Sequence, residues 1–394
     1  MKFKIVLFLM FRSLFAEQSL LLLNDTSECY HWGCTGTSQA MREEIQEIGY
    51  ALESISILDL RNLEGVPSSF SLFDEKEKFQ LFKQSNPSLC ERLKKSDIVV
   101  INGEGSIHMM RPLPRALLYV AYISKKFFGK HTEIINHSCF PEDCLKVDDE
   151  ETRDLYAGVY KTVDYVCVRE PLSRTVLNSL GVEKVDESFD SLPLYIRKHY
   201  TVPQKAASNT IVLAGSVDWK EEGMKIVVQE LKKLEEQGYK IQVLVGAKDR
   251  PAYDDKLFVE FLSDELKSGW ELIDAKSLDE WLGAIANADL LVSGRFHHTI
   301  AAICLKTPFV VLNSNTPKIE GMLSIMPNRH VEVLQYLDPD LETKIQNSID
   351  AAFQMSEETF PTLEIICEKA QKKFSNLQSY EKCGWQKQKH FQSD

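Results

Sequence analysis

The residue types and spacing best suited to chemistry lie in the segment Val292–His298, at the end of the apolar run that begins at Leu290. An extended backbone would point Arg295 and His297 to the same side, because alternate residues share a face. Arginine grips a carboxylate or phosphate with two hydrogen bonds, and a helix N-terminus at His297 offers further N–H groups to an anion. Gly294 would permit close approach of a ligand. The alternative is structural: Arg295 pairs with an acid, and His297 packs or caps the helix.

Two further strand ends carry candidate side chains. Arg169 ends the apolar run Asp164–Val168, where a cation is costly to bury unless it meets an anion. That anion could be a ligand, or simply Glu170 or Asp190, and the sequence leaves both alternatives open. His137 follows another strand, and it is either a ligand contact or a structural histidine.

Glycines and hydroxyls follow two other strands. The turn Asn102–Ser106 suits close approach of the backbone to a ligand, although it lacks the third glycine of a dinucleotide fingerprint. Within it, Glu104 is expected to be solvated, with a general base as the alternative. The loop Cys29–Ser38, which contains Trp32, precedes a helix expected at Thr37–Ile48. This loop forms either an anion cradle or a capped helix start.

The remaining cations, histidines and cysteines add one candidate and argue against a metal site. Lys318 follows a strand expected at 309–313, so it lies beside the same cleft or is an ordinary surface lysine. Adjacent His297 and His298 would diverge rather than chelate, so we expect no metal. The nine cysteines include no C-x-x-C pair, which predicts reduced, packed thiols and favours a reducing compartment.

Length and charge limit the class of protein. The 394 residues predict two domains at roughly 100–200 residues each, and 44% hydrophobic with 26% charged residues is typical of a soluble globular protein. A net charge of −12 argues against a nucleic-acid partner. Met1–Ala16 is a candidate signal or short anchor, which Arg12 and Leu14 disfavour without excluding it. No other stretch approaches the roughly 20 apolar residues of a membrane-spanning helix.

Short β-branched runs alternate with segments of helical period, which predicts βαβ units and parallel sheets. The polar, aperiodic stretch 195–209 predicts a boundary between two α/β lobes. We therefore expect an N-terminal lobe at 1–200, a C-terminal lobe at 201–341, and C-terminal helices with a tail at 342–394. The expected strands are 20–24, 51–60, 97–102, 132–136 and 164–168, then 211–216, 241–246, 272–275, 290–293 and 309–313. Ligands bind where parallel strands end, so the candidate residues should meet there.

These segments resemble the polysaccharide pyruvyl transferase family. The resemblance runs from about residue 20 to residue 330 and is strongest at Ser293–His297. It also includes the glycine- and hydroxyl-rich turn before Gln39–Met41, the segment Asp97–Ser106, and the patterns at 168–181 and 315–321.

The resemblance implies a glycosyltransferase-B-like fold of two Rossmann-like lobes, with the C-terminal helices packing back. It implies transfer of a pyruvyl group from phosphoenolpyruvate to sugar hydroxyls of a cell-surface glycan or its precursor. The products would be a ketal and free phosphate, without a cofactor or metal. The two arginines would bind the donor, and one histidine would be the acid or base. The catalytic set is Arg169, Arg295 and His297, and the donor side adds Ser293, Gly294, His137 and Lys318.

The acceptor, a glycan or a lipid-linked sugar, is expected on the first lobe, among loops 25–38, 103–115 and 137–145. The acceptor-side candidates are Trp32, Thr35, Gly103 and Glu104. The acceptor sugar, its linkage and the oligomeric state are not readable from the sequence. A cytoplasmic location is expected, with membrane association through the acceptor as the alternative.

Two positions depart from the family pattern. Glu104 stands where a glycine is expected, and His298 where a small residue follows the histidine. Glu104 could crowd the acceptor side, mark a different acceptor or alter the chemistry. The main alternative function is a glycosyltransferase of the same fold with a nucleotide-sugar donor, whose ribose Glu320 would bind. A non-catalytic carbohydrate-binding protein is disfavoured, because a retired site would not keep two unpaired arginines.

Overall fold

The computed structural model describes residues 18–28, 31–203, 208–245, 255–266, 269–327 and 331–380. The candidate signal or anchor at Met1–Ala16 lies outside them, as do Cys29 and Cys383. Seven described cysteines are free thiols, and five of these are buried, as packed thiols should be. Within the described residues, no helix is both long and apolar enough to cross a bilayer.

The first lobe is built on a parallel sheet in the order β2-β1-β3-β4-β5-β6. Its described strands are β1 (Ser19–Asp25), β2 (Ala51–Ser56), β3 (Ile98–Glu104), β4 (His131–His137), β5 (Tyr165–Val168) and β6 (Asp186–Glu187). Strands β1, β3 and β4 are almost entirely buried, because helices cover both faces of the sheet. These helices are α2 (Trp32–Ile48), α3 (Ile57–Leu60), α4 (Lys76–Ser85), α5 (Pro87–Lys95), α6 (Pro112–Lys126), α7 (Glu150–Tyr160), α8 (Pro171–Ser179) and α9 (Leu192–His199).

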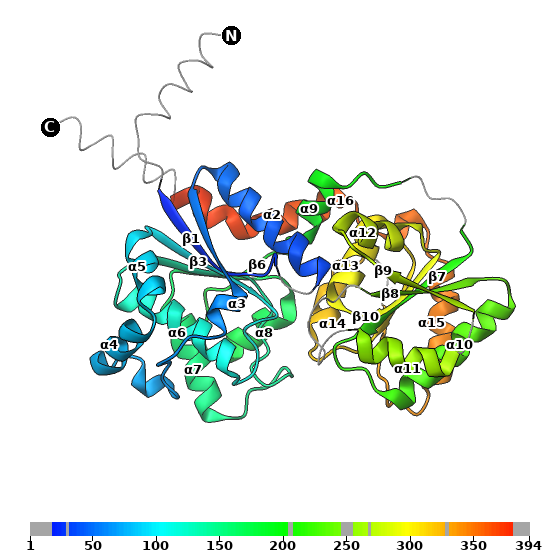
Figure 1. Cartoon of the computed structure of the whole chain (residues 1–394), viewed down its shortest axis with the longest axis horizontal. Helices are drawn as coiled ribbons and strands as arrows, with labels where there is room; N and C mark the ends of the chain where they lie inside the picture. The colour runs from blue at the N-terminus through cyan, green and yellow to red at the C-terminus, as the bar shows by residue number, and fades with distance from the viewer. Residues whose placement is uncertain are drawn as a thin grey trace, which may run out of the picture.

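The second lobe repeats this design with the strand order β12-β11-β10-β7-β8-β9 (Figure 1). Its described strands are β7 (Thr210–Ser216), β8 (Lys240–Val245), β9 (Trp270–Asp274), β10 (Leu290–Gly294), β11 (Phe309–Leu312) and β12 (Val333–Leu334). Its helices are α10 (Glu221–Glu236), α11 (Lys256–Leu266), α12 (Leu278–Asn287), α13 (Phe296–Leu305) and α14 (Lys318–Leu323). The prediction of two α/β lobes with parallel sheets is confirmed.

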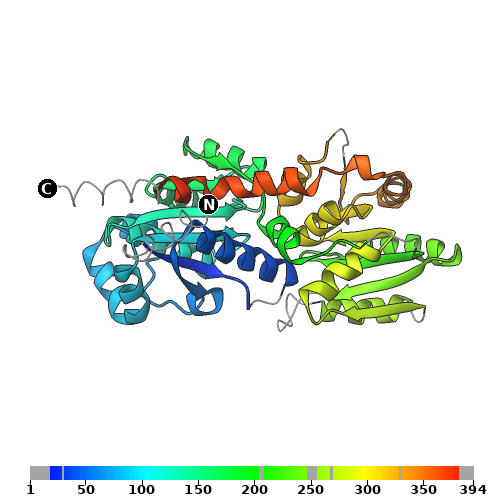
Figure 2. The same cartoon turned by 90° about the horizontal axis from the view of Figure 1, so that it is seen from above.

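The C-terminal helices α15 (Leu341–Phe353) and α16 (Leu363–Gln371) follow the last strand, and the chain is strandless from there to residue 380. Figure 2 shows the red C-terminal segment lying across both lobes. Helix α16 packs on α9, and Tyr50 Oη donates a hydrogen bond of 2.8 Å to the carbonyl of Leu377. One buried apolar cluster includes Met41, Trp281 and Ile366, so both lobes and α16 share a core.

Two expected elements have different bounds in the structure. The strand expected at 51–60 ends at Ser56, whose hydroxyl accepts a hydrogen bond from the Leu58 amide and so caps α3. The helix expected from Thr37 begins five residues earlier, at Trp32. Strands β6 and β12, each of two residues, were not predicted, because such short runs show no alternation of apolar and polar residues.

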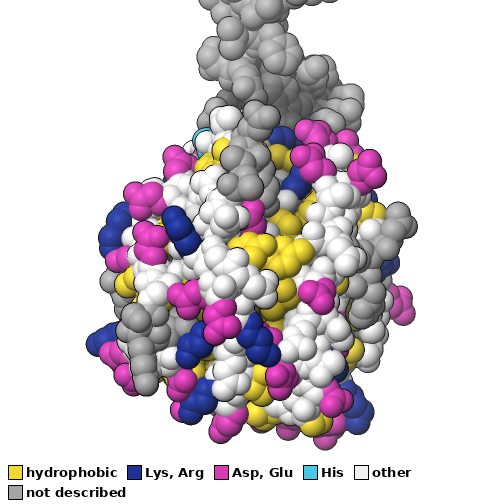
Figure 3. All heavy atoms as spheres, turned by 90° about the vertical axis from the view of Figure 1, so that its right-hand side faces the viewer, with side chains coloured by type: hydrophobic (Ala, Val, Ile, Leu, Met, Phe, Trp, Pro, Cys, Tyr) yellow, Lys and Arg dark blue, Asp and Glu magenta, His cyan; other side chains and the backbone are white. Residues whose placement is uncertain are grey.

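The predicted domain limits remain a proposal. The first sheet ends at Glu187, the second begins at Thr210, and its last strand ends at Leu334. Helix α9 lies between the two sheets in sequence and contacts both α2 and α13. On the face of the second lobe drawn in Figure 3, the described acidic and basic side chains are interspersed, so they form no continuous basic field there for a phosphate backbone.

Candidate active site

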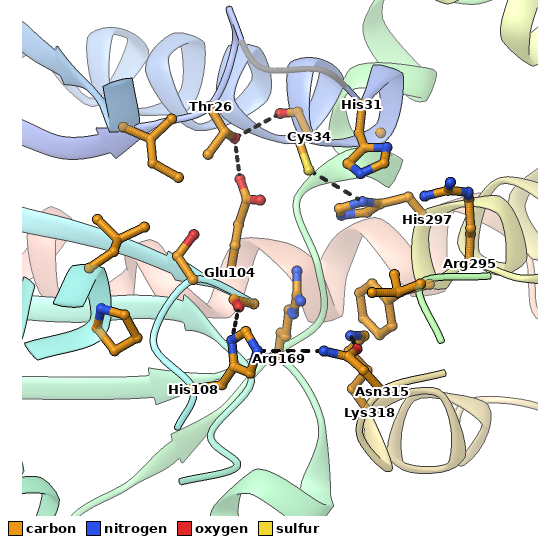
Figure 4. A pocket seen from close by; sticks show the side chains of 18 of the residues that line it. Thr26, His31, Cys34, Glu104, His108, Arg169, Arg295, His297, Asn315 and Lys318 are labelled. Atoms are coloured by element: carbon orange, nitrogen blue, oxygen red, sulfur yellow. Dashed lines mark hydrogen bonds between the residues drawn. The ribbon is translucent and has the colours of Figure 1, made fainter. Parts of the chain in front are cut away.

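A cavity of about 430 Å³ opens between the two lobes, at the carboxyl ends of their strands. Figure 4 shows charged and titratable side chains entering it from both lobes. The residues that bear on its chemistry are Glu104, His108 and Arg169 from the first lobe, and Arg295, His297 and Lys318 from the second. The structure therefore brings together the three residues of the expected catalytic set.

Arg169 follows β5, and its guanidinium is almost wholly buried. Nη1 donates to Asp190 Oδ2 at 2.7 Å, and Nε donates to Ser138 Oγ at 2.8 Å. The guanidinium lies 4.2 Å from the centre of the Phe296 ring, which comes from the second lobe. Of the two carboxylate partners left open by the sequence, Asp190 is the one observed. Glu170 instead caps α8 by accepting from the Ser173 amide.

His297 lies in the first turn of α13 and faces the first lobe. Its Nε2 lies 3.5 Å from Asp190 Oδ2 and 3.4 Å from Thr37 Oγ1. Helix α2 reaches this histidine because of Gly33, where a Cβ atom would lie only 2.2 Å from the Cβ of His297. A carboxylate of one lobe thus supports the histidine of the other.

Asp190, which the sequence named only as a possible ion-pair partner of Arg169, contacts residues of both lobes. Burial alone would raise the pKa of its carboxyl group, but the charge and hydrogen bond of His297, together with Arg169, hold that pKa well below its usual range. Its other oxygen accepts from Thr37 Oγ1 and from the Leu192 amide, which fixes the carboxylate in place. No sequence pattern marks this arrangement, because the two-residue strand β6 that precedes Asp190 shows no alternation of apolar and polar residues.

Arg295 immediately precedes α13 and pairs with Asp255, and both side chains are buried. Its Nε has no hydrogen-bond partner among the described residues. The expectation of two unpaired arginines was wrong, because a buried guanidinium needs an anion and the fold supplies Asp255 and Asp190. Both arginines nevertheless keep part of their surface on the cavity.

Ser293 and Gly294 support this region without lining the cavity. The Ser293 hydroxyl accepts a hydrogen bond of 3.1 Å from the Arg295 amide. A Cβ on Gly294 would lie 2.5 Å from the Cβ of Ser216 and 2.6 Å from the Asn313 carbonyl. Gly294 therefore serves the packing of β10 against its neighbouring strands, not the approach of a ligand as expected.

Lys318 begins α14 and lines the cavity, so it is not a surface lysine. Its Nζ donates to Asn315 Oδ1 at 2.5 Å. Burial, and then the charge of Arg169, lower the pKa of its ammonium to about 8. Lys318 and Arg169 thus place two cations from opposite lobes close enough to act on one anion.

His137, the expected second donor contact, does not line the cavity. Its ring is fully buried and stacks on Tyr160 at 5.7 Å between ring centres. Burial, reinforced by Arg169, lowers its pKa to about 3. Gly103 also stays behind the surface, because a Cβ there would lie 2.6 Å from the Cβ of His137.

His108 lines the cavity in its place, and sequence reasoning missed it. Its Nδ1 lies 2.7 Å from the Gly105 carbonyl, and its Nε2 lies 3.5 Å from the Asn315 amide of the other lobe. Burial and the nearby Lys318 lower the pKa of His108 to about 4. Nothing in its local sequence distinguishes it, since the contact with Asn315 joins residues 207 positions apart.

Some of the acceptor-side candidates line the cavity and others do not. Glu104 and Trp32 line the cavity, and Trp32 Nε1 also donates to the Ala275 carbonyl of the second lobe at 3.1 Å. Thr35 lies inside α2, where its hydroxyl donates to the backbone carbonyls of Ser27 and His31. The expectation that Glu104 is solvated was wrong: the side chain is buried, and its Oε1 accepts hydrogen bonds from the Thr26 hydroxyl and from the side-chain amide of Asn102.

His298, the second departure from the family pattern, is buried against Trp281. Trp281 Nε1 donates to His298 Nε2 at 3.1 Å, with the two rings perpendicular. Burial and the nearby charges of Arg295 and His297 lower the pKa of His298 well below its usual value. This histidine is therefore neutral and structurally fixed, although part of it reaches the cavity wall.

Solved structures with the same architecture share little sequence with this chain. UDP-GlcNAc 2-epimerase from Methanocaldococcus jannaschii, in complex with UDP-GlcNAc and UDP, superposes with a TM-score of 0.52 at 15% identity, over 93% of this chain and 100% of that one. The Neisseria meningitidis enzyme bound to UDP-GlcNAc gives 0.54 at 12%, over 89% and 98%. Anabaena HepE in complex with UDP-glucose gives 0.53 at 12%, over 94% and 100%. These likenesses show the glycosyltransferase-B-like fold.

Sequence comparison identifies the family. No curated protein matches the chain in sequence. A sequence model of the polysaccharide pyruvyl transferases, however, matches residues 39–316, a span that includes Arg169, Arg295 and His297. The chain belongs to the polysaccharide pyruvyl transferase family.

Proposed function

We propose that this protein transfers a pyruvyl group from phosphoenolpyruvate to two hydroxyls of a glycan or lipid-linked sugar, releasing phosphate. One observation carries the proposal: Arg169, Arg295 and His297, contributed by opposite lobes, line one cavity. The family implies an acceptor of polysaccharide type, and the residues gathered in the cavity suit a small, multiply charged donor.

The charge of the cavity favours such a donor. Among the described residues, its lining includes one carboxylate, Glu104, and five cationic side chains: Arg61, Arg111, Arg169, Arg295 and Lys318. With the partner carboxylates Asp190 and Asp255 included, five cations face three carboxylates. A local positive field of this kind attracts an anion although the whole chain carries a net charge of −12.

The reaction requires a proton donor next to cations. His297 would protonate the methylene carbon of phosphoenolpyruvate, which creates an oxocarbenium-like centre that a hydroxyl can attack. Asp190 would stabilise the protonated imidazole. The guanidiniums of Arg169 and Arg295 would neutralise the carboxylate and the departing phosphate as charge develops. No step of this scheme requires a metal.

A nucleotide-sugar donor is the alternative, since the similar epimerase structures hold UDP-GlcNAc. Glu320, the carboxylate proposed for a ribose, does not line the cavity. Burial raises its pKa, as expected for a group removed from solvent. This placement favours phosphoenolpyruvate.

Isothermal titration with phosphoenolpyruvate and with a panel of UDP sugars separates the two functions. We expect binding of phosphoenolpyruvate; binding of a UDP sugar alone would reverse the assignment. Arg295→Ala should reduce phosphate release with a sugar acceptor at least 100-fold, because one donor-binding charge is lost at the reacting centre. Arg174→Ala, on the exposed face of α8, is the matched control and should behave as the wild type. Unchanged phosphate release by the Arg295 variant would contradict the assignment.

A further inference from the structure

Three neighbouring strands of the first sheet enter the left-handed backbone region near their carboxyl ends. The residues are Asn24 in β1 (φ 64°), Glu104 in β3 (φ 40°) and Asn136 in β4 (φ 55°). Asparagine tolerates this conformation, whereas glutamate has no special aptitude for it, and a glycine would adopt it freely. An unfavourable backbone conformation persists where the surrounding structure imposes it, typically at a functional site. Glu104 is therefore the residue of this set that needs an explanation.

A buried chain of hydrogen bonds leads to the Glu104 carboxylate. Lys373 Nζ, from the C-terminal segment, donates to Asn136 Oδ1 at 2.8 Å. Asn136 Nδ2 donates to Asn102 Oδ1 at 3.0 Å, and Asn102 Nδ2 donates to Glu104 Oε1 at 2.8 Å. Thr26 Oγ1 donates to the same oxygen at 2.6 Å. All of these side chains are buried.

The direction of this chain is fixed by its two ends. An ammonium group can only donate, so Asn136 must present its oxygen to Lys373 and its NH₂ group to Asn102. Asn102 must then present its NH₂ group to Glu104, which accepts. The chain of donors therefore ends on Glu104 Oε1.

The second carboxylate oxygen of Glu104 is left for the cavity. Both hydrogen bonds, from Thr26 and Asn102, end on Oε1, and Oε2 accepts none from the described residues. Figure 4 shows the carboxylate on the first-lobe side, opposite His297 and Arg295. As the one carboxylate among the described lining residues, Glu104 repels the anionic donor and attracts a hydroxyl.

We propose that Glu104 is the base of the acceptor half-reaction: it binds a hydroxyl of a neutral sugar diol through Oε2 and takes its proton. The proposal rests on the proposed function and adds the residue that selects and activates the acceptor. A neutral diol is the acceptor class that fits, because an anionic sugar group placed there would face the carboxylate. His297 of the second lobe and Glu104 of the first thereby serve the two first proton transfers, to the methylene carbon and from the first hydroxyl.

The proton balance of the reaction closes with these two groups. His297 gives a proton to the methylene carbon, and a C–O bond forms from the first hydroxyl as its proton moves to Glu104. The C–O bond to phosphate then breaks, and Glu104 returns its proton to the departing phosphate. The second hydroxyl forms the second C–O bond, and its proton restores His297. Two hydroxyl protons thus end on the methyl carbon and on phosphate, with no other reactant.

Two substitutions test the role of Glu104. Glu104→Gln keeps an oxygen that can accept from Thr26 and Asn102 but cannot take a proton, so phosphoenolpyruvate affinity should stay within about twofold while kcat for phosphate release falls at least 100-fold. Glu104→Gly suits the left-handed backbone, so it should fold, and the space it leaves should admit formate as a substitute base. We expect formate to restore turnover of this variant. Glu133→Gln, a buried glutamate on β4 that does not line the cavity, is the matched control.

Each variant is measured with phosphoenolpyruvate and a panel of neutral methyl glycosides and simple diols. Loss of turnover with retained donor binding in Glu104→Gln, together with formate rescue in Glu104→Gly, supports the proposal. Wild-type turnover by Glu104→Gln, or by Glu104→Gly without formate, overturns it and leaves the proposed function intact. Absence of phosphoenolpyruvate binding or of phosphate release by the wild-type protein overturns the proposed function, and this proposal with it.

Discussion

Replacing Asp190 by asparagine tests whether this carboxylate, which lies between Arg169 and His297, stabilises the fold and supports the histidine. The Asn oxygen can keep the hydrogen bonds from Thr37 and the Leu192 amide on one side. On the other side, an NH₂ group would face Arg169 Nη1, which lies 2.7 Å from the present oxygen. The substitution thus removes one charge from a buried group of cations and leaves the shape nearly unchanged.

The magnitude follows from this geometry. At an effective dielectric constant near 20, the attraction of unit charges 2.7 Å apart is about 6 kcal/mol before their dehydration is counted. Breaking one partner of a buried ion pair costs about 3–5 kcal/mol, because the remaining charge stays buried. We therefore expect Asp190→Asn to lower the free energy of unfolding by about this amount. Loss of support for protonated His297 should lower kcat by roughly 10²–10⁴.

Urea unfolding gives the stability change, and phosphate release measured well below the unfolding midpoint gives kcat. The matched control is Asp148→Asn, whose ion pair with Lys146 has the same 2.7 Å separation but is exposed, so neither quantity should change. Unchanged stability of Asp190→Asn would refute the assigned cost of the buried pair. Reduced stability with wild-type kcat would refute the role of Asp190 in supporting His297.

Two further outcomes are expected. Gly33→Ala should lower kcat at least tenfold and destabilise the protein by about 1–3 kcal/mol, because the new Cβ would lie 2.2 Å from that of His297. Gly283→Ala, in an open position on α12, is the control and should change neither quantity. Measurements of kcat and of the urea midpoint check both variants. Acid should weaken the fold, because the lowered pKa values of His108 and His137, about 4 and about 3, keep both rings neutral when folded. Above the unfolded pKa near 6.5, neither histidine lowers the free energy of unfolding. As the pH falls below 6.5, only the unfolded state takes up the proton, so each histidine lowers the free energy of unfolding by about 2 kcal/mol at pH 5. Urea unfolding at pH 7 and pH 5, which should show a smaller difference in His137→Phe than in the wild type, checks this; equal differences would contradict it.

The meeting of Arg169, Arg295 and His297 at one cavity was predictable because it depends on local rules. An arginine after β5 and an Arg-x-His segment after β10 each follow a buried run, and parallel strands bring such ends to one edge. The partner carboxylates were predictable only in part: Asp190 was one of two candidates for Arg169, and the packed structure selects it over Glu170. Asp255 lies 40 residues before Arg295 and was not named, so only the packed structure shows that pair.

The errors in prediction have the same physical origin. Gly294 and Gly103 are both needed because another group packs closely against them, but neither of these groups is a ligand. Gly294 packs against neighbouring strands, and Gly103 packs against His137. Glu104 was expected in solvent because glutamate usually is; a buried amide chain from Lys373 changes that outcome. The type of a residue limits the roles it can have, and the residues that contact it in the folded structure determine which of these roles it has.

The packing of α9 against α16 has a mechanical consequence. The chain passes from the first lobe to the second after α9 and returns through α16, so both connections lie side by side (Figures 1 and 2). Two adjacent connections would confine any rotation of one lobe against the other to a single axis. Asp190 and Lys373 lie next to these connections and should move least in such a rotation. Arg295 and Lys318 belong to the second lobe, so such a rotation would change their distance to Arg169 of the first lobe.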